Sequence, residues 1–323
     1  MDQGVPLVEI WRGELLESIH SGHAVICGAD GEILEAWGNP SQPIFPRSSC
    51  KMIQALPLLR SGAANRAGLG PQQLALACAS HQGAAIHREH VAAWLGDLGL
   101  DDSALRCGIQ PASDIPERDR MILTGEEPCQ VHNNCSGKHT GFLTWVRDTG
   151  ADPEYLEIDH PLQIAVRGAF EEVTGETSPT WAIDGCSAPN FATSAHGLAR
   201  AMAHFASSSD NAETRLREAM IAHPDLVAGE TRACTELMRA TPGVALKTGA
   251  DGVYTAIIPE KKIGIALKIA DGATRASEAA ITRLLIRLGL LDASHPAALK
   301  RLGPVTNWRG TQTGDTRAAS ALA

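Results

Sequence analysis

A serine and a lysine lie three residues apart in the stretch Pro46-Arg47-Ser48-Ser49-Cys50-Lys51-Met52. Pro46 fixes the entry of the chain, so the stretch predicts a helix start with Ser48 near its N-terminus. Lys51 would then lie about one turn from Ser48 on the same helical face. Ser49 is the competing serine, but its partner at the same spacing is Met52. The spacing therefore selects Ser48.

This pair of residue types indicates nucleophilic catalysis. A serine hydroxyl is a weak nucleophile unless a neighbouring base removes its proton. A lysine can be that base only when it is neutral, a state that burial or a nearby cation favours. Free N–H groups at a helix N-terminus can also stabilise an oxyanion. The pattern indicates Ser48 as nucleophile and Lys51 as its base, although a capped surface helix would show the same spacing.

A second motif, Lys247-Thr248-Gly249, lies on a predicted strand. Serine β-lactamases and penicillin-binding proteins pair Ser-x-x-Lys on a helix with Lys-Thr-Gly on a facing strand. Their middle motif also occurs here as Ser209-Asp210-Asn211, but these residue types are preferred helix caps and we expect a cap. Ser80, at the end of a predicted helix, is the better middle serine.

Strand patterns at both ends of the chain enclose a helical middle. Alternating residues predict strands within residues 7–38, with a hairpin turn at Ala29-Asp30-Gly31-Glu32. Three further strands are expected between 244 and 269, followed by a helix over 273–288. The intervening pattern is helical from 61 to 240.

Helices packed on an antiparallel sheet suit this order of elements, so we predict an α+β fold. The N-terminal strands would join the C-terminal strands in a single sheet. We expect a discontinuous sheet domain formed by residues 1–60 and 241–323, and a mainly helical insertion at 61–240. Residues 303–323 are expected to form a loose polar tail.

Composition excludes several classes of function. The chain has 323 residues, 44% hydrophobic and 20% charged, which is ordinary for a globular protein. Its net charge is −9 with no basic run, which argues against binding to nucleic acid or to an anionic membrane surface. The start resembles no secretory signal, and no apolar run reaches transmembrane length. We therefore expect a cytoplasmic protein whose eight scattered cysteines are reduced.

Several stretches together carry a resemblance to a known family. They are Pro46 to Pro57, Ala77 to Gly83, His132 to Gly141, Asp184 to Asn190, and Lys247 to Lys268 with the following Ala270 to Arg275. Over nearly its whole length the chain resembles the rhizobial-type (class 3) L-asparaginases, also called asparaginase II. The resemblance implies a serine β-lactamase-like fold, a homodimer, and hydrolysis of L-asparagine to L-aspartate and ammonia through an acyl-enzyme.

The resemblance also assigns the catalytic residues. Ser48 and Lys51 would form one Ser–Lys pair, and Ser80 and Lys247 a second one. The second pair would relay protons and keep Lys51 neutral by repulsion between like charges. Loop lengths differ near Lys247, so Lys268, which also lies on a predicted strand, is the alternative partner of Ser80.

A zinc ion is implied by the resemblance, with Cys135, Lys138 and Cys186 as its ligands. A lysine ligand must be neutral, so the metal would have to lower its pKa strongly. From the residues alone, His132, Cys135 and His139 would be preferred, because they follow the spacing i, i+3, i+7 with ordinary zinc donors. A reduced buried cysteine without metal is the commoner situation.

Substrate contacts are expected from Arg47, Asn133, His139, Asp184 and Gly249. Asp184, with the zinc, would orient the α-amino and carboxylate end of the substrate. For Arg47, Asn133 and His139, hydrogen bonding within the protein is an equal alternative. Backbone N–H groups at Ser48 and after Gly249 would form the oxyanion hole.

Two rival interpretations stay open. A β-lactamase-like acyl hydrolase with another substrate is supported by Lys247-Thr248-Gly249 and opposed by the lack of a secretory signal, because such enzymes meet their substrates outside the cytoplasm. A zinc-binding or regulatory protein on a hydrolase scaffold would contain metal but show no turnover. The sequence does not decide between asparagine and glutamine.

Overall fold

The structure is a computed structural model that describes residues 3–323, and these divide into two compact units. Unit 1 contains the sheet and unit 2 is mainly helical. Unit 1 comprises the chain up to Ser49, Thr193–Ser207 and Glu236–Ala323, and unit 2 comprises Cys50–Ala192 and Ser208–Thr235. The division therefore falls inside the Ser48/Lys51 stretch rather than near residue 60.

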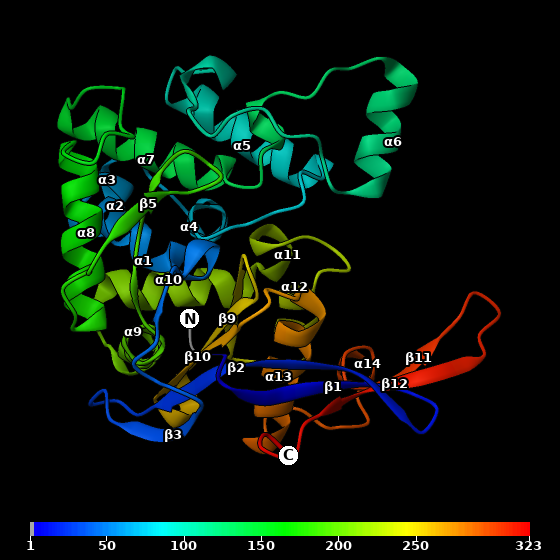
Figure 1. Ribbon diagram of the computed structural model, residues 1–323. Coiled ribbons are helices and arrows are strands. Elements are labelled where there is room, and N and C mark those ends of the chain that lie inside the picture. Colours follow the sequence, from blue (N-terminus) through cyan, green and yellow to red (C-terminus); the bar gives the residue numbers. More distant parts are fainter. Residues whose placement is uncertain (1–2) are drawn as a thin grey trace. The chain divides into compact units, whose positions relative to one another are not determined.

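Unit 1 is built on an eight-stranded antiparallel sheet in the order β11-β12-β1-β2-β10-β9-β8, with β3 paired to β2 (Figure 1). The strands are β1 (Val5–Arg12), β2 (Leu15–Cys27), β3 (Ile33–Trp37), β8 (Ala245–Gly249), β9 (Val253–Ile258), β10 (Ile263–Ile269), β11 (Gly303–Thr306) and β12 (Gln312–Ala318). Pairing of β2 with β10 confirms that the N-terminal and C-terminal strands share one sheet. The predicted hairpin turn between β2 and β3 is also confirmed.

The prediction that residues 303–323 form a loose tail is wrong. Residues 303–323 begin with a hairpin, β11 and β12, and β12 pairs with β1 along the register Val8↔Ala318 to Trp11↔Asp315. The chain then returns to the core, where Leu322 is fully buried. Its polar residues misled the prediction because they lie on exposed faces of an edge hairpin, while its backbone hydrogen bonds are made to β1.

Helices cover the sheet of unit 1. The helix α9 (Ala195–Ser207) packs on β2, β9 and β10, so this part of the predicted helical insertion belongs to the sheet unit. The helix α13 (Thr274–Arg287) packs on β1, β9, β10 and β12 and confirms the predicted closing helix. Smaller elements are α14 (Pro296–Leu299), η4 (Pro259–Lys261) and the strand pair β4 (Pro43–Ile44) and β7 (Thr193–Ser194).

Unit 2 is a helical assembly with one short hairpin. Its centre is α7 (Ser136–Thr149), which is buried from Ser136 to Val146 and packs on α3, α4 and α5. The other elements are α1 (Lys51–Gln54), α2 (Leu56–Arg60), α3 (Ala63–Arg66), α4 (Pro71–Ala77), α5 (Ala85–Asp97), η2 (Asp102–Ala104), α6 (Ile115–Thr124), η3 (Gln130–His132), α8 (Pro161–Thr174), β5 (Trp181–Ile183), β6 (Pro189–Phe191), α10 (Asn211–Ala222) and α11 (Pro224–Val227).

The start of α10 and the absence of a membrane-spanning helix were also predicted. Asp210 is the N-cap residue of α10, so Ser209-Asp210-Asn211 lies at a helix start as predicted, but the Asp210 side chain makes no capping hydrogen bond. The helix α12 (Ala233–Ala240) then leads back from unit 2 into unit 1. Within residues 3–323, the structure contains no helix that is long and apolar enough to cross a membrane.

Candidate active site

Ser48 lies in a tight turn of unit 1. The chain forms the 3-10 helix η1 (Arg47–Cys50) directly before α1, so the predicted helix start is present with a tighter first turn. Ser49 is fully buried, and its hydroxyl donates a hydrogen bond to the Pro46 carbonyl at 2.7 Å. Ser48 is only half-buried. The Ser49 hydroxyl thus has a structural bond, while the choice of Ser48 as nucleophile stays a prediction.

The end of β8 lies directly against this turn. A Cβ atom on Gly249 would come within 2.5 Å of the Pro46 carbonyl oxygen and 2.8 Å of the Ser49 nitrogen. Both neighbours are backbone atoms, so only glycine allows this approach. The hydroxyl of Thr255, on β9, lies 3.2 Å from the Ser49 carbonyl and also 3.2 Å from the Lys247 carbonyl. The Lys-Thr-Gly strand and the Ser48 turn are thus in contact within unit 1.

Both candidate lysines of unit 1 point to the face of the sheet that carries this contact. Lys247 and Gly249 alternate on β8, so their side-chain directions share one face. Thr255 is the register partner of Lys247 and of Ala266, which places Lys268, two residues further along β10, on the same face. Lys247 is buried, whereas Lys268 is half-buried. Which of the two completes the second pair stays a prediction.

Lys51 occupies a buried position in unit 2. Its amine, on a side chain only 1% exposed, donates to the Ala79 carbonyl and to the Cys135 sulfur at 3.0 Å. Ala79 immediately precedes Ser80, whose own N–H donates to the Val227 carbonyl at 2.9 Å. The Lys51 amine is therefore fixed at the backbone beside Ser80. No sequence pattern marked the Ala79 carbonyl as its partner.

Two cysteines and a lysine form a compact cluster in unit 2. The Lys138 amine donates to the Cys186 sulfur at 3.0 Å. A hydrogen bond from the Cys135 thiol, helped by the Lys138 charge, lowers the pKa of Cys186 well below its ordinary value, and the same contact raises that of Cys135. Burial opposes the charge on Lys138, but the Cys186 and Cys135 sulfurs outweigh it and raise the Lys138 pKa. These directions favour a charged Lys138 amine beside the Cys186 sulfur.

His139 is held beside this cluster by a tyrosine that the sequence did not single out. The Tyr155 hydroxyl accepts a hydrogen bond from the Arg106 N–H at 3.0 Å and lies 2.9 Å from Nδ1 of His139. Burial first, and the Lys138 charge next, lower the pKa of His139 to about 4. His139 is therefore neutral at pH 7.

The residues of the cluster can be compared with the needs of a zinc ion. Two thiols supply sulfur donors of the kind that zinc binds, whereas the Lys138 amine could bind only after losing its proton, against the raised pKa of this group. Among residues 3–323, no group of three or more His, Cys, Asp or Glu side chains could hold a metal. The alternative set His132, Cys135 and His139 is thus not assembled. A zinc ion fits here only with Lys138 as a ligand beside Cys135 and Cys186.

Two further predicted substrate contacts are placed by the structure. Asn133 donates to the Cys107 and Gly108 carbonyls at 2.9 and 3.0 Å and accepts from the Cys135 N–H at 2.8 Å. This geometry favours a structural role for Asn133. Asp184 lies in the turn of the β5–β6 hairpin, and its charge contributes to the raised pKa of Lys138.

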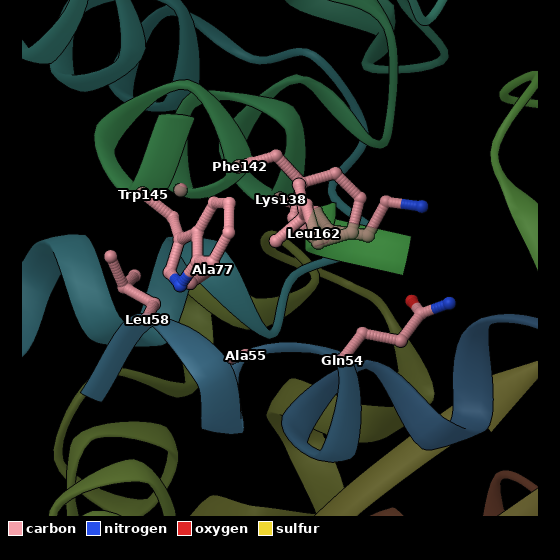
Figure 2. A pocket seen from close by; sticks show the side chains of 9 residues that line it. Gln54, Ala55, Leu58, Ala77, Lys138, Phe142, Trp145 and Leu162 are labelled. Atoms are coloured by element: carbon pink, nitrogen blue, oxygen red, sulfur yellow. The ribbon is translucent and has the colours of Figure 1, made fainter. Parts of the chain in front are cut away.

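A small cavity lies next to the stem of Lys138 (Figure 2). Its volume is about 10 Å³, and its lining is mostly apolar, with Leu58, Phe142 and Trp145 among the walls. Figure 2 shows the polar ends of Gln54 and Lys138 extending in the same direction. A cavity of this size holds about one water molecule, so it cannot be the site of an amino-acid substrate.

The sequence pattern of the L-asparaginase II family matches residues 8–318. This chain belongs to that family. The resemblance inferred from the motifs is therefore confirmed, and membership supports amidohydrolase activity on a small-molecule amide. As a family member, the chain carries the Ser48/Lys51 stretch and the cysteine–lysine cluster inside the matched region. No curated protein matches the chain.

Three solved structures of similar fold are distant from this chain in sequence. The native form of Mglu is 12% identical at a TM-score of 0.47, over 85% of this chain and 66% of that chain. A β-lactamase from Mycobacterium bovis is 13% identical at a TM-score of 0.37, over 82% and 94%. A Bacillus glutaminase is 13% identical at a TM-score of 0.39, over 83% and 91%. This chain thus spans slightly less than two thirds of Mglu, and similarities this remote carry no argument about activity.

Proposed function

We propose that this family member hydrolyses L-asparagine to L-aspartate and ammonia, with Ser48 as nucleophile. The family match over residues 8–318 is the observation that carries the proposal. The choice of serine is supported by the Ser49 hydroxyl, which is bound to the Pro46 carbonyl. The contact of Gly249 with the same turn supports a role for the Lys-Thr-Gly strand in the reaction.

In the proposed mechanism, Ser48 attacks the side-chain amide carbon while Lys51, three residues along the chain, accepts the hydroxyl proton. Backbone N–H groups at Ser48 and after Gly249 stabilise the oxyanion. The proton is passed to the leaving nitrogen, ammonia departs, and water then cleaves the acyl-enzyme to release L-aspartate. The pairing of Ser80, in unit 2, with Lys247, in unit 1, is part of this proposal and relays protons to Lys51.

The test of this proposal is ammonia and aspartate release from L-asparagine by the purified protein, with L-glutamine and nitrocefin measured in parallel. We expect ammonia and L-aspartate in equal amounts and no nitrocefin hydrolysis. Nitrocefin turnover without ammonia release would support the β-lactamase-like alternative instead. A protein that turns over none of these substrates would contradict the asparaginase assignment. A cytoplasmic location and a homodimer are further expectations from the resemblance.

Zinc is a second part of the proposal. Cys135, Lys138 and Cys186 would hold it, with the lysine neutral, and the ion would supply a positive charge at this cluster. Metal analysis of the purified protein should find about one zinc per chain. Cys186→Ser should lose most of it, whereas Cys27→Ser should retain it, because Cys27 is a buried cysteine of unit 1 near the His196 carbonyl. Equal zinc contents in both variants would exclude this ligand set.

A further inference from the structure

Arg47, the residue before Ser48, forms a loose ion pair with Asp251 in unit 1. Arg47 has a left-handed φ of 52°, a conformation that non-glycine residues adopt rarely and that often occurs at functional sites. Its Nη1 lies 3.8 Å from Oδ2 of Asp251, and the two side chains are 30% and 78% exposed. This separation is longer than a hydrogen bond, so the ion pair itself occupies no hydrogen-bonding position on the carboxylate.

The fold fixes the position of Asp251 beside the Ser48 turn. Asp251 lies in the turn between β8 and β9, two residues after Gly249, which contacts the Pro46 carbonyl and the Ser49 nitrogen. On its other side, a Cβ on Gly272 would come within 2.8 Å of the Asp251 Cβ. Lys268 is near enough for the Asp251 charge to act on its pKa, which burial lowers. The Asp251 carboxylate thus lies near the charges of Arg47 and Lys268, and its side chain is 78% exposed.

We propose that Asp251 is a specificity residue that binds the α-ammonium group of the substrate, while Arg47 binds its α-carboxylate. A free amino acid carries these two opposite charges on one carbon atom, and this partly exposed Arg–Asp pair, next to the proposed nucleophile in the chain, presents the complementary charges. The substrate class is then side-chain amides of free α-amino acids, not amides that lack the amino group or carry it acylated. The link to turnover rests on the function proposed above.

An ordinary surface ion pair would contribute little to stability and nothing to substrate discrimination. The kinetic test compares L-asparagine with succinamate, the same amide without the α-amino group. Asp251→Asn should raise KM for L-asparagine about tenfold or more with kcat nearly unchanged, because one charge-assisted contact is lost. The same variant should not reduce kcat/KM for succinamate. Asp315→Asn is the matched control, since Asp315 is a surface carboxylate of unit 1 paired with Arg317 at 3.0 Å.

A binding experiment separates this inference from the proposed reaction. Calorimetric titration with L-aspartate and with succinate compares a ligand that has the α-ammonium with one that lacks it, and needs no turnover. The wild type should bind L-aspartate more tightly, and Asp251→Asn should remove the preference. If the wild type binds both ligands equally, or if Asp251→Asn weakens both equally, the assignment of Asp251 is wrong, even where ammonia release is observed. If the wild type prefers L-aspartate but releases no ammonia, the assignment of Asp251 stands and the proposed hydrolysis of L-asparagine is wrong.

Discussion

Ser48→Ala is expected to reduce ammonia release from L-asparagine by about a thousandfold or more, because the nucleophile of the proposed acyl-enzyme is lost. Its fold should be intact, since Ser48 is only half-buried in a turn. Steady-state ammonia release and the melting temperature should be measured on the same preparation. A catalytic loss with an unchanged melting temperature would place the chemistry on Ser48.

The neighbouring serine offers a matched control for this variant. Ser49→Ala removes a hydroxyl that donates to the Pro46 carbonyl at 2.7 Å, so it should lower stability by about 1 kcal/mol and reduce activity far less. An inactive Ser49→Ala variant beside an active Ser48→Ala variant would reverse the assignment. If both the Ser48→Ala and the Ser49→Ala variants keep their activity, Ser80 becomes the candidate nucleophile.

Gly249→Ala is the second change with a large expected effect. The new Cβ would meet the Pro46 carbonyl oxygen at 2.5 Å and the Ser49 nitrogen at 2.8 Å, and neither backbone atom can rotate away. Either the end of β8 or the Ser48 turn must shift. We expect a loss of about 1–3 kcal/mol in the free energy of unfolding. We also expect ammonia release to fall about a hundredfold, because displacement of a catalytic group by about 1 Å has this effect.

The control for this substitution is Gly168→Ala in α8. Gly168 has no neighbouring atom within 4 Å of an added Cβ, so alanine should leave activity unchanged and stabilise the helix by up to about 1 kcal/mol. Urea unfolding followed by circular dichroism, together with ammonia release, compares the two variants. Wild-type activity in Gly249→Ala would show that the turn and the strand need not be in contact for catalysis.

Much of the fold could be predicted because its signals are local. Short apolar runs predicted β8, β9 and β10 nearly to the residue, and Ala29-Asp30-Gly31-Glu32 marked the turn after β2. The tail was missed because β12 becomes a strand through its partner β1, which lies at the other end of the chain. An edge hairpin with polar faces has the same composition as a loose segment, so no local pattern separates the two.

Some features of the candidate site could likewise be predicted from the sequence, and others could not. The sequence by itself determined the family, the Ser48/Lys51 spacing and the identity of the cysteines, because these are properties of residue type and order. Only the tertiary structure decided that the Lys51 amine binds the Ala79 carbonyl and that Asp251 lies beside Arg47. These partners are distant in the chain, and the packing of strands and helices, which no local pattern encodes, brings them close together.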